Sequence, residues 1–505
     1  MFNTRRAALL AAVSSAGLLA AAGAAHAETL ADAIALAYQT NPTLQEQRAS
    51  QRALDETYVQ ARTGLRPTVD ATASVSEREI RTAAGETQVD TDNNGIPDTT
   101  IPVPSFTSRT SASAGQIEVT QPIYTGGRVT SQISASEADV LAGREGLRQV
   151  EAGVLLNVVQ AYVDVRRDQE RLRIAQENVS VLNRQLEEAR ARFEVGEITR
   201  TDTAQAEARQ AAARATLASA QAALAISRAN YAAVVGQNPG ELAPEPSLAP
   251  LLPATVDQAF ERAQENNGAV RAAGFEERAS SARVAAARAK RRPTVGLRGT
   301  LGYSAAEVND VGNRFGDYDR DITGSVVASM PIFTGGLTNS QVRQASARNT
   351  ADRIAIEGAR RDVLQDVARA WNQLLGARAN LVANQEQVNA AQIAFEGTRE
   401  EAQVGLRTTL DVLNAEQELR NAQLALVTAR RDEYVAAALV LAAMGDLEAP
   451  KLVPGVEAYD PAANFNRVKH SWGWVPWEYG VEMIDRVGAP PIGKAPENSP
   501  VAGEK

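Results

Sequence analysis

The chain repeats itself, and this duplication constrains its fold more than any other feature of the 505-residue sequence. The segment Gln121-Pro-Ile-Tyr-Thr-Gly-Gly127 returns as Met330-Pro-Ile-Phe-Thr-Gly-Gly336, at an offset of 209 residues. The same offset carries Val195-Gly196 onto Val404-Gly405 without a gap. An internal repeat of this length predicts two copies of one structural unit.

A second pair of landmarks shows that the two copies differ in length. Arg66-Pro67-Thr68-Val69 matches Arg292-Pro293-Thr294-Val295 at an offset of 226 residues. The first copy therefore carries a 17-residue longer insertion between its Arg-Pro-Thr and Gly-Gly landmarks. A helix of about 35 residues is predicted before each Arg-Pro pair, from Leu30 to Thr63 and from Val256 to Lys290. The proline should end that helix.

Alternation of apolar and polar residues follows each Arg-Pro break, as in a β-strand. Apolar or small residues recur at every second position in two of these segments: Val69, Ala71, Ala73 and Val75, then Val295, Leu297, Gly299, Leu301 and Tyr303. Strands are expected at about 68–77, 112–123, 294–304 and 321–332. One apolar face suits strands with lipid on one side and water on the other. A soluble sheet with two unlike faces fits the same segments equally well.

Each copy closes with a long helical stretch. No proline occurs between Pro122 and Pro239, or between Pro331 and Pro450. Apolar residues step by threes and fours in the pattern of a coiled coil, at Leu172, Ala175, Val179, Leu182, Leu186, Ala189 and Phe193. Glycines at 196 and 405, followed by Thr and Asp residues, end one helix and cap the next. Helical hairpins are predicted at about 131–235 and 339–444, with tips near 196–202 and 405–411.

The N-terminus has the pattern of a secretory signal peptide. Two arginines, Arg5 and Arg6, precede an apolar run, and Ala25-His26-Ala27 offers a cleavage site. Removing residues 1–27 would change the formal charge from −9 to −11. An exported acidic chain is a poor candidate for binding nucleic acid.

Composition also excludes several kinds of chemistry. The chain has no cysteine, so thiolate metal sites, cysteine nucleophiles and disulfides are impossible. It has two histidines, of which His26 would leave with the signal peptide and His470 lies in a polar tail. No constellation of nucleophile, base and metal ligand emerges, so an enzyme is not expected.

The predicted domains follow from these landmarks. Residues 1–27 form the signal peptide, 28–235 the first repeat, 236–255 a linker with five prolines, and 256–447 the second repeat. Residues 448–505 lose the periodicity and carry a cluster of aromatic residues, Trp472, Trp474, Trp477 and Tyr479. This tail is expected to pack on the surface near the middle of the molecule or to be disordered.

Four candidate strands cannot close on themselves, and an open sheet edge cannot sit in lipid because its backbone groups go unpaired. Several chains must then share one barrel. Two chains would give eight strands, which side chains would fill, whereas three would give twelve strands and a lumen.

Taken together, these features resemble the TolC family of outer-membrane channel-tunnels. The resemblance covers roughly residues 29–447 and rests on the signal peptide, the two copies, the Pro-Ile-Tyr/Phe-Thr-Gly-Gly turns and Val-Gly-x-x-Thr at both tips. It implies a mainly α, α+β membrane protein in the cell outer membrane. The family fold is a homotrimer, in which a 12-strand transmembrane β-barrel continues into a 12-helix periplasmic α-barrel.

The resemblance also implies partners. Family members receive an exported substrate from an inner-membrane ABC transporter or proton-driven pump through a periplasmic adaptor protein, and they contact outer-membrane lipid. The Gln-Pro-Ile-Tyr-Thr-Gly-Gly segment and the missing lipid-bearing cysteine favour the type I secretion branch, which exports proteins. Two alternatives stay open: a multidrug or metal efflux duct of the same fold, and a pore-less periplasmic coiled-coil scaffold.

The second hairpin tip resembles the family's periplasmic gate. There, two acids one helical turn apart form constricting rings on the threefold axis. Asp411 matches the first acid, whereas the second position is Asn414. A ring of three Asp411 carboxylates would attract cations and raise its own pKa. The alternative role for Asp411 is capping of its helix.

Further gate residues are carried over by the same resemblance. Arg407 matches the arginine that ties the inner hairpin to its neighbour, and Thr201 and Asp202 match the acceptors of such ties. The family's tyrosine on the inner hairpin falls at Ala402, so one closing link is missing here. Asp202 could equally cap its own helix, and Arg407 could be an ordinary solvated charge.

One loop in the longer insertion resembles a calcium site. Asp90, Asp92, Asn94 and Asp98 place oxygen ligands at relative positions 1, 3, 5 and 9, with a glycine at position 6. The distal glutamate of such loops is absent, because position 12 is Ile101. A structural Ca²⁺ and a plain polar turn are both compatible with the pattern. No other cofactor is expected.

Overall fold

The computed structural model describes residues 27–309, 311–312, 315–471 and 473–487. The predicted signal peptide, up to residue 26, and Trp472 lie outside the described residues. The chain divides into two compact units. The helical unit contains residues up to 52, 141–274 and 354–461, and the strand unit contains 53–140, 275–353 and the residues from 462 onward.

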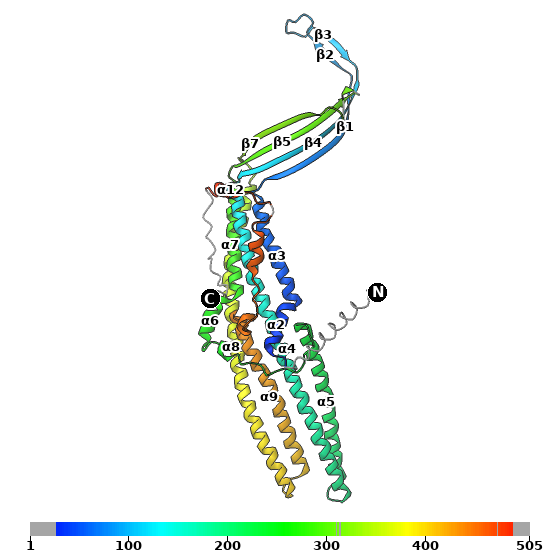
Figure 1. The fold of residues 1–505 in the computed structure, drawn as a ribbon, viewed down its shortest axis with the longest axis vertical. Coiled ribbons are helices and arrows are strands. Elements are labelled where there is room, and N and C mark those ends of the chain that lie inside the picture. The colour runs from blue at the N-terminus through cyan, green and yellow to red at the C-terminus, as the bar shows by residue number, and fades with distance from the viewer. Residues whose placement is uncertain (1–26, 310, 313–314, 472, 488–505) are drawn as a thin grey trace, which may run out of the picture. The chain divides into compact units, whose positions relative to one another are not determined.

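Four antiparallel strands form the sheet of the strand unit, in the order β1 (Thr68–Thr82), β4 (Phe106–Tyr124), β5 (Thr294–Val308) and β7 (Asp319–Ser329) (Figure 1). All four predicted strands are confirmed, and three are longer than expected. A short strand, β6 (Val311–Gly312), pairs with β5. The longer insertion of the first copy forms a separate hairpin of β2 (Gly85–Val89) and β3 (Thr99–Val103).

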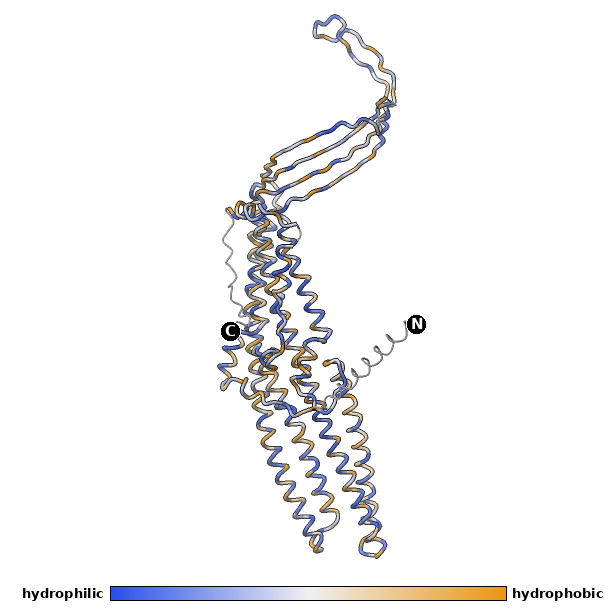
Figure 2. Tube along the Cα trace, viewed as in Figure 1, coloured by the Kyte–Doolittle hydropathy of each residue, from blue (hydrophilic) through white to orange (hydrophobic). Residues whose placement is uncertain are grey.

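The strand register gathers the apolar residues on one face of this sheet. Val69 lies opposite Val119, and Ala71 lies opposite Ile117. Ile117 in turn lies opposite Leu301, which lies opposite Ile322. The other face is polar, with Asp70 opposite Glu118 and an ion pair of 3.1 Å between Glu118 and Arg298. The alternation of hydropathy along each strand is visible in Figure 2. The sheet therefore has one apolar and one polar side.

The helix predicted before each Arg-Pro pair is broken, which corrects the prediction. The first segment divides into α2 (Leu30–Thr40) and α3 (Pro42–Thr63), and the second into α6 (Val256–Asn266) and α7 (Gly268–Ala289). The cause is an asparagine at each break. The Asn41 carboxamide oxygen accepts from the Thr43 amide at 3.0 Å and so caps the second helix. Asn267 does the same for Ala269 at 2.8 Å.

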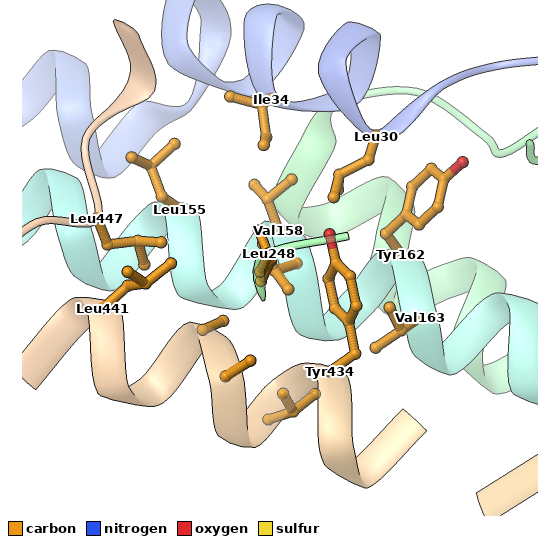
Figure 3. Close-up of a cluster of buried hydrophobic side chains, with 14 of the residues drawn as sticks. Leu30, Ile34, Leu155, Val158, Tyr162, Val163, Leu248, Tyr434, Leu441 and Leu447 are labelled. Atoms are coloured by element: carbon orange, nitrogen blue, oxygen red, sulfur yellow. The ribbon is translucent and has the colours of Figure 1, made fainter. Parts of the chain in front are cut away.

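Two helical hairpins are confirmed. The first consists of α4 (Arg128–Glu194) and α5 (Arg200–Val235), and the second of α8 (Leu337–Gln403) and α9 (Thr409–Met444). In the helical unit their apolar stripes meet α2 in a shared core, shown in Figure 3, which includes Leu30, Leu155, Tyr162 and Leu441. No helix within the described residues is both long and apolar enough to cross a membrane.

The linker, residues 236–255, lacks α-helix as predicted and contains one 3₁₀ turn, η1 (Ala249–Leu251). Residues 449–471 and 473–487 have more secondary structure than the aperiodic sequence implied. They contain α10 (Ala449–Leu452), α11 (Pro461–Val468) and α12 (Glu478–Asp485). Since α12 packs through Val481 against Leu65, Val129 and Ile133, the tail is part of a small core of the strand unit.

Two buried acids fix α12 in place. Glu478 accepts from Arg62 at 2.7 Å and from Arg66 at 3.0 Å. Asp485 lies at the start of α4, where it accepts from the backbone amides of Thr125 at 2.5 Å and Gly127 at 3.2 Å. Because the first amides of a helix have no partner within it, this carboxylate acts as a cap supplied from about 360 residues away.

Candidate functional site

The two hairpin tips have the same local construction. Each turn contains a glycine with positive φ, 81° at Gly196 and 79° at Gly405, a conformation that residues with a Cβ rarely adopt. A threonine then begins the returning helix. Thr199 and Asp202 form a reciprocal capping box at the start of α5, and Thr408 and Asp411 form the matching box at the start of α9. The capping roles of Asp202 and Asp411 are therefore confirmed.

Capping sets the charge of these two acids. The Thr408 amide donates to Asp411 at 2.9 Å and the Thr408 hydroxyl at 2.8 Å. These hydrogen bonds hold the pKa of Asp411 below its usual range, and the nearby Arg407 adds to the effect. The Thr199 amide and hydroxyl lower the pKa of Asp202 in the same way. Both residues are partly exposed and stay ionised at neutral pH in the single chain.

Arg407 has a partner within its own hairpin. Its Nε donates to Glu401 at 2.8 Å across the tip turn, and both side chains are about half exposed. Within the described chain it therefore pairs with Glu401 rather than with Thr201 or Asp202. Thr201 occupies the first turn of α5 and is exposed. The structure thus does not bring the three predicted tie residues together in one chain.

Asn414 does connect the two hairpins. Arg209 on α5 donates to the Asn414 carboxamide oxygen at 3.0 Å. Close by, Leu413 packs with Leu182 and Ala213 in a small apolar cluster. The second predicted gate position thus takes part in a contact between the first and second hairpins.

A residue that the sequence reasoning missed lies one half turn beyond Asn414. Glu416 is only 2% exposed, between the two hairpins. Gln185 on α4 donates to Glu416 Oε2 at 2.7 Å, and Arg420 approaches Glu416 Oε1 at 3.8 Å. Desolvation raises the pKa of Glu416, although Gln185, Arg420 and Arg184 oppose this. Its spacing from Leu413 and Leu419 places it on the buried stripe of α9, and this was the signal that could have revealed it.

Two buried oxygens at the Glu416–Gln185 contact would both be paired if the Glu416 carboxyl group were protonated. Glu416 Oε1 and Gln185 Oε1 are both buried without a hydrogen-bond partner. A protonated Glu416 could donate to the Gln185 oxygen while it accepts from the Gln185 amide, which would pair both atoms. We call the Glu416–Gln185 pair the inter-hairpin latch. The equivalent residue of the first copy, Glu207, is exposed and pairs with Arg190 at 2.7 Å.

The loop singled out for calcium lies between β2 and β3. Asp90, Asp92 and Asp98 each place a carboxylate oxygen within 4.8 Å of the others. Their oxygens also accept hydrogen bonds inside the loop, from the Gly95 amide to Asp90 at 2.6 Å and from Asn94 Nδ2 to Asp92 at 2.8 Å. The Thr91 hydroxyl lowers the pKa of Asp98. The geometry therefore serves a hydrogen-bonded polar turn, and calcium binding stays a prediction.

Comparison with known proteins places the chain among outer-membrane channels. The family model described as outer membrane efflux protein matches residues 33–237 and 259–446. Outer membrane efflux protein BepC of Brucella suis biovar 1 is 34% identical over 94% of this chain and 97% of its own length. Outer membrane protein TolC of Vibrio cholerae is 28% identical over 86% of this chain and 94% of its own.

A more distant relative and a solved structure add to this result. The alkaline protease secretion protein AprF of Pseudomonas aeruginosa is 27% identical over 59% of this chain and 63% of its own length. The crystal structure of the outer membrane protein VceC from Vibrio cholerae matches with a TM-score of 0.65 at 21% identity. It covers 82% of this chain and 96% of VceC, which supports the fold.

Proposed function

The chain belongs to the outer membrane efflux protein family, the family of TolC, and on that premise we propose that it is the exit duct of a type I secretion system. Members of this family are outer-membrane transport ducts rather than enzymes. They are homotrimers that work with inner-membrane pumps and periplasmic adaptors. In our proposal the pump is an ABC transporter and the cargo is a protein.

The observation that carries the proposal is the open sheet. It has one apolar face, and its outer strands β1 and β7 leave one edge each unpaired among the described strands. Strands with an apolar and a polar face suit a wall between lipid and a water-filled lumen. Three copies would supply twelve strands and close the wall. The polar face, with Asp70, Glu118 and Arg298, would then line the passage.

The entrance of the duct would be formed by the second hairpin. Asp411 would supply a ring of three negative charges, and the latch at Glu416 would hold the second hairpin against the first. The ring would repel itself by about 2 kcal/mol per pair if its carboxylates were about 7 Å apart at an effective dielectric near 20. Separation of the hairpins would relieve that repulsion and widen the entrance.

Deletion of the gene in its own bacterium tests the proposal. Loss of one or more proteins from the culture medium, restored by the wild-type gene, is the expected result. Drug or metal sensitivity without any loss of secreted protein would instead support an efflux duct. That alternative is favoured by the name of the BepC relative, which is described as an efflux protein.

The pore-less scaffold is tested by fractionation of the same strain. A channel requires detergent for its extraction from the outer membrane, whereas a scaffold is released with the periplasmic proteins. The type I assignment is supported by AprF, which is described as a protease secretion protein. An ABC exporter and an adaptor encoded beside this gene would agree with it, and a proton-driven pump in their place would contradict it.

A further inference from the structure

The two strand-to-helix turns have nearly the same sequence but different surroundings. In the first copy, Ile123 packs into the small core that α12 completes, and Asp485 caps the helix. In the second copy, Ile332 is 96% exposed and Phe333 is 87% exposed. Met330 and Leu337 on either side are also exposed. We call these four residues the open turn. Such an apolar patch at the end of a strand indicates a surface that another molecule covers.

The internal repeat predicts which part of a neighbouring chain lies beside the open turn. Thr68 pairs with Thr120 in the first copy, and Thr294 pairs with Ser329 in the second. The offset of 226 carries Thr68 onto Thr294, and the offset of 209 carries Thr120 onto Ser329. The two strands of each copy therefore pair in the same register. The pairing between copies is given by β4 and β5, where Ile117 lies opposite Leu301. The offset of 209 carries Ile117 onto Val326, and the offset of 226 carries Val75 onto Leu301. If the free edges of neighbouring chains pair in the same way, Val326 of one chain lies opposite Val75 of the next.

The hydrophobic pattern supports this register independently. Val326 and Val75 both lie on the apolar face of their sheet, and both are largely exposed. Further along the seam, Ala328 would lie opposite Ala73, again with both residues on the apolar face. A slip by one residue would set apolar residues of one chain beside polar residues of the other. The repeat-derived register therefore gives a continuous apolar face.

This register brings the open turn to the tail of the next chain. Tyr124 lies opposite Val295 within one chain. By the same offsets, Phe333 of one chain would lie opposite Val69 of the next. Val69 follows Arg66, which holds α12 through Glu478. The tail exposes a set of large apolar residues, Trp474, Trp477, Tyr479, Met483 and Ile484. Two exposed apolar surfaces would thus meet at the start of β1.

We propose that the open turn of each chain packs against the exposed tail residues of a neighbouring copy, in the register that sets Val326 opposite Val75. The C-terminal tail then has two roles, since it completes the first turn of its own chain and covers the second turn of the next. This interface rests on the homotrimeric assembly of the proposed function. It accounts for the aromatic cluster of the tail, which the duct itself does not require.

Cysteine cross-linking tests the register directly, because the natural chain has no cysteine. The pair Val75→Cys and Val326→Cys is introduced into the full-length protein and oxidised in isolated outer membranes. Covalent dimers and trimers on a non-reducing gel are expected. The matched control is Ile117→Cys with Leu301→Cys, the equivalent pair within one chain, which should leave the protein monomeric on the gel. The pair Val75→Cys and Val327→Cys, on opposite faces, should give no link.

Intermolecular links from Val75→Cys with Val327→Cys, but not with Val326→Cys, would overturn the register. The proposed function is tested separately by the mass of the unmodified protein in detergent. A monomer there contradicts the trimer itself, whereas a trimer without the predicted link contradicts only the interface.

Charge substitution tests the contact with the tail. Ile332→Asp should make the trimer dissociate at a lower temperature in detergent, and Tyr479→Asp on the tail should have the same effect. The control is Ile96→Asp, an exposed apolar residue in the β2–β3 loop, which should leave the dissociation temperature unchanged. If Ile332→Asp and Tyr479→Asp trimers are as stable as the wild type, the tail does not cover the open turn.

Discussion

The first and second repeats share their local chemistry but differ in what their side chains contact. Both tips use the same glycine turn and the same Thr–Asp capping box. Beyond the tips, Glu207 is exposed in the first hairpin, whereas Glu416 is buried against Gln185 in the second. Duplication has thus preserved the fold of each copy, while a single position of the second copy has gained a buried contact between the hairpins.

The largest loss of stability is expected at the first strand-to-helix turn, because the tail caps this turn and not the second one. Asp485→Ala would remove a buried carboxylate that accepts from Thr125, Gly127 and Thr130. The unpaired buried donors should cost about 3 kcal/mol of local stability. Hydrogen exchange of the amides at 125–130 should then speed up roughly a hundredfold. The amides at 334–338, in the second turn, serve as the internal control. If their exchange accelerated equally, Asp485 would not act on the first turn alone.

The next largest effect is a pH dependence of the conductance, which should depend on Glu416 and not on Glu207. Burial raises the pKa of Glu416 in the latched state, so that state binds the proton more tightly than the opened state does. The latch should strengthen as pH falls through the raised pKa and weaken as pH rises through it. Each unit of pKa difference corresponds to about 1.4 kcal/mol. Channel conductance should therefore increase with pH over this window.

Glutamine substitutions separate the two acids. Glu416→Gln imitates the neutral carboxyl group and can still pair with Gln185, so its conductance should stay low at every pH. Glu207→Gln removes an exposed ion pair and should keep the pH dependence of the wild type. A pH response that survives in Glu416→Gln would show that another group controls the entrance.

A smaller effect tests whether the two tips are equivalent. Thr199→Ala and Thr408→Ala should each destabilise the first turn of their helix by about 1 kcal/mol, because each removes a capping hydroxyl. Local hydrogen exchange after residues 200 and 409 measures both changes. Effects that differ by more than about twofold in free energy would contradict the shared capping chemistry.

The smallest effect is expected at the β2–β3 loop, which lies in the insertion that makes the first copy longer. If calcium binds, its affinity should be weak, with a Kd on the order of 10⁻⁴–10⁻³ M, because the distal glutamate is missing. Calorimetry of the whole protein measures the heat of binding, and Asp90→Asn with Asp92→Asn serves as the control. The same heat from wild type and variant, or none from either, would leave the loop as a polar turn.

Much of the fold could be predicted because the relevant signals are local or repeated. The glycines at 196 and 405 placed both tips, and the period of two placed all four strands of the sheet. The breaks at Asn41 and Asn267 were missed, although Asn41-Pro42 is a local signal for a helix boundary. Continuous apolar spacing across each break concealed them.

The contacts that could not be predicted are long-range. Asp485 caps a helix that starts more than 350 residues earlier, and nothing in the aperiodic tail specifies that contact. Similarly, the partner of Glu416 depends on how α9 packs against α4. Capping was one of two roles that the sequence allowed for Asp411 and Asp202, and the structure shows it. A place on a threefold axis depends on other copies of the chain.

Conductance in planar bilayers tests whether three copies form a channel whose entrance the second hairpin controls. The purified protein should produce small, cation-selective currents. Arg407→Ala should enlarge these currents, and Asp411→Ala should reduce the preference for cations. Absence of any conductance from the protein inserted in the bilayer would contradict the channel, and cation selectivity unchanged without Asp411 would contradict the ring of Asp411 charges.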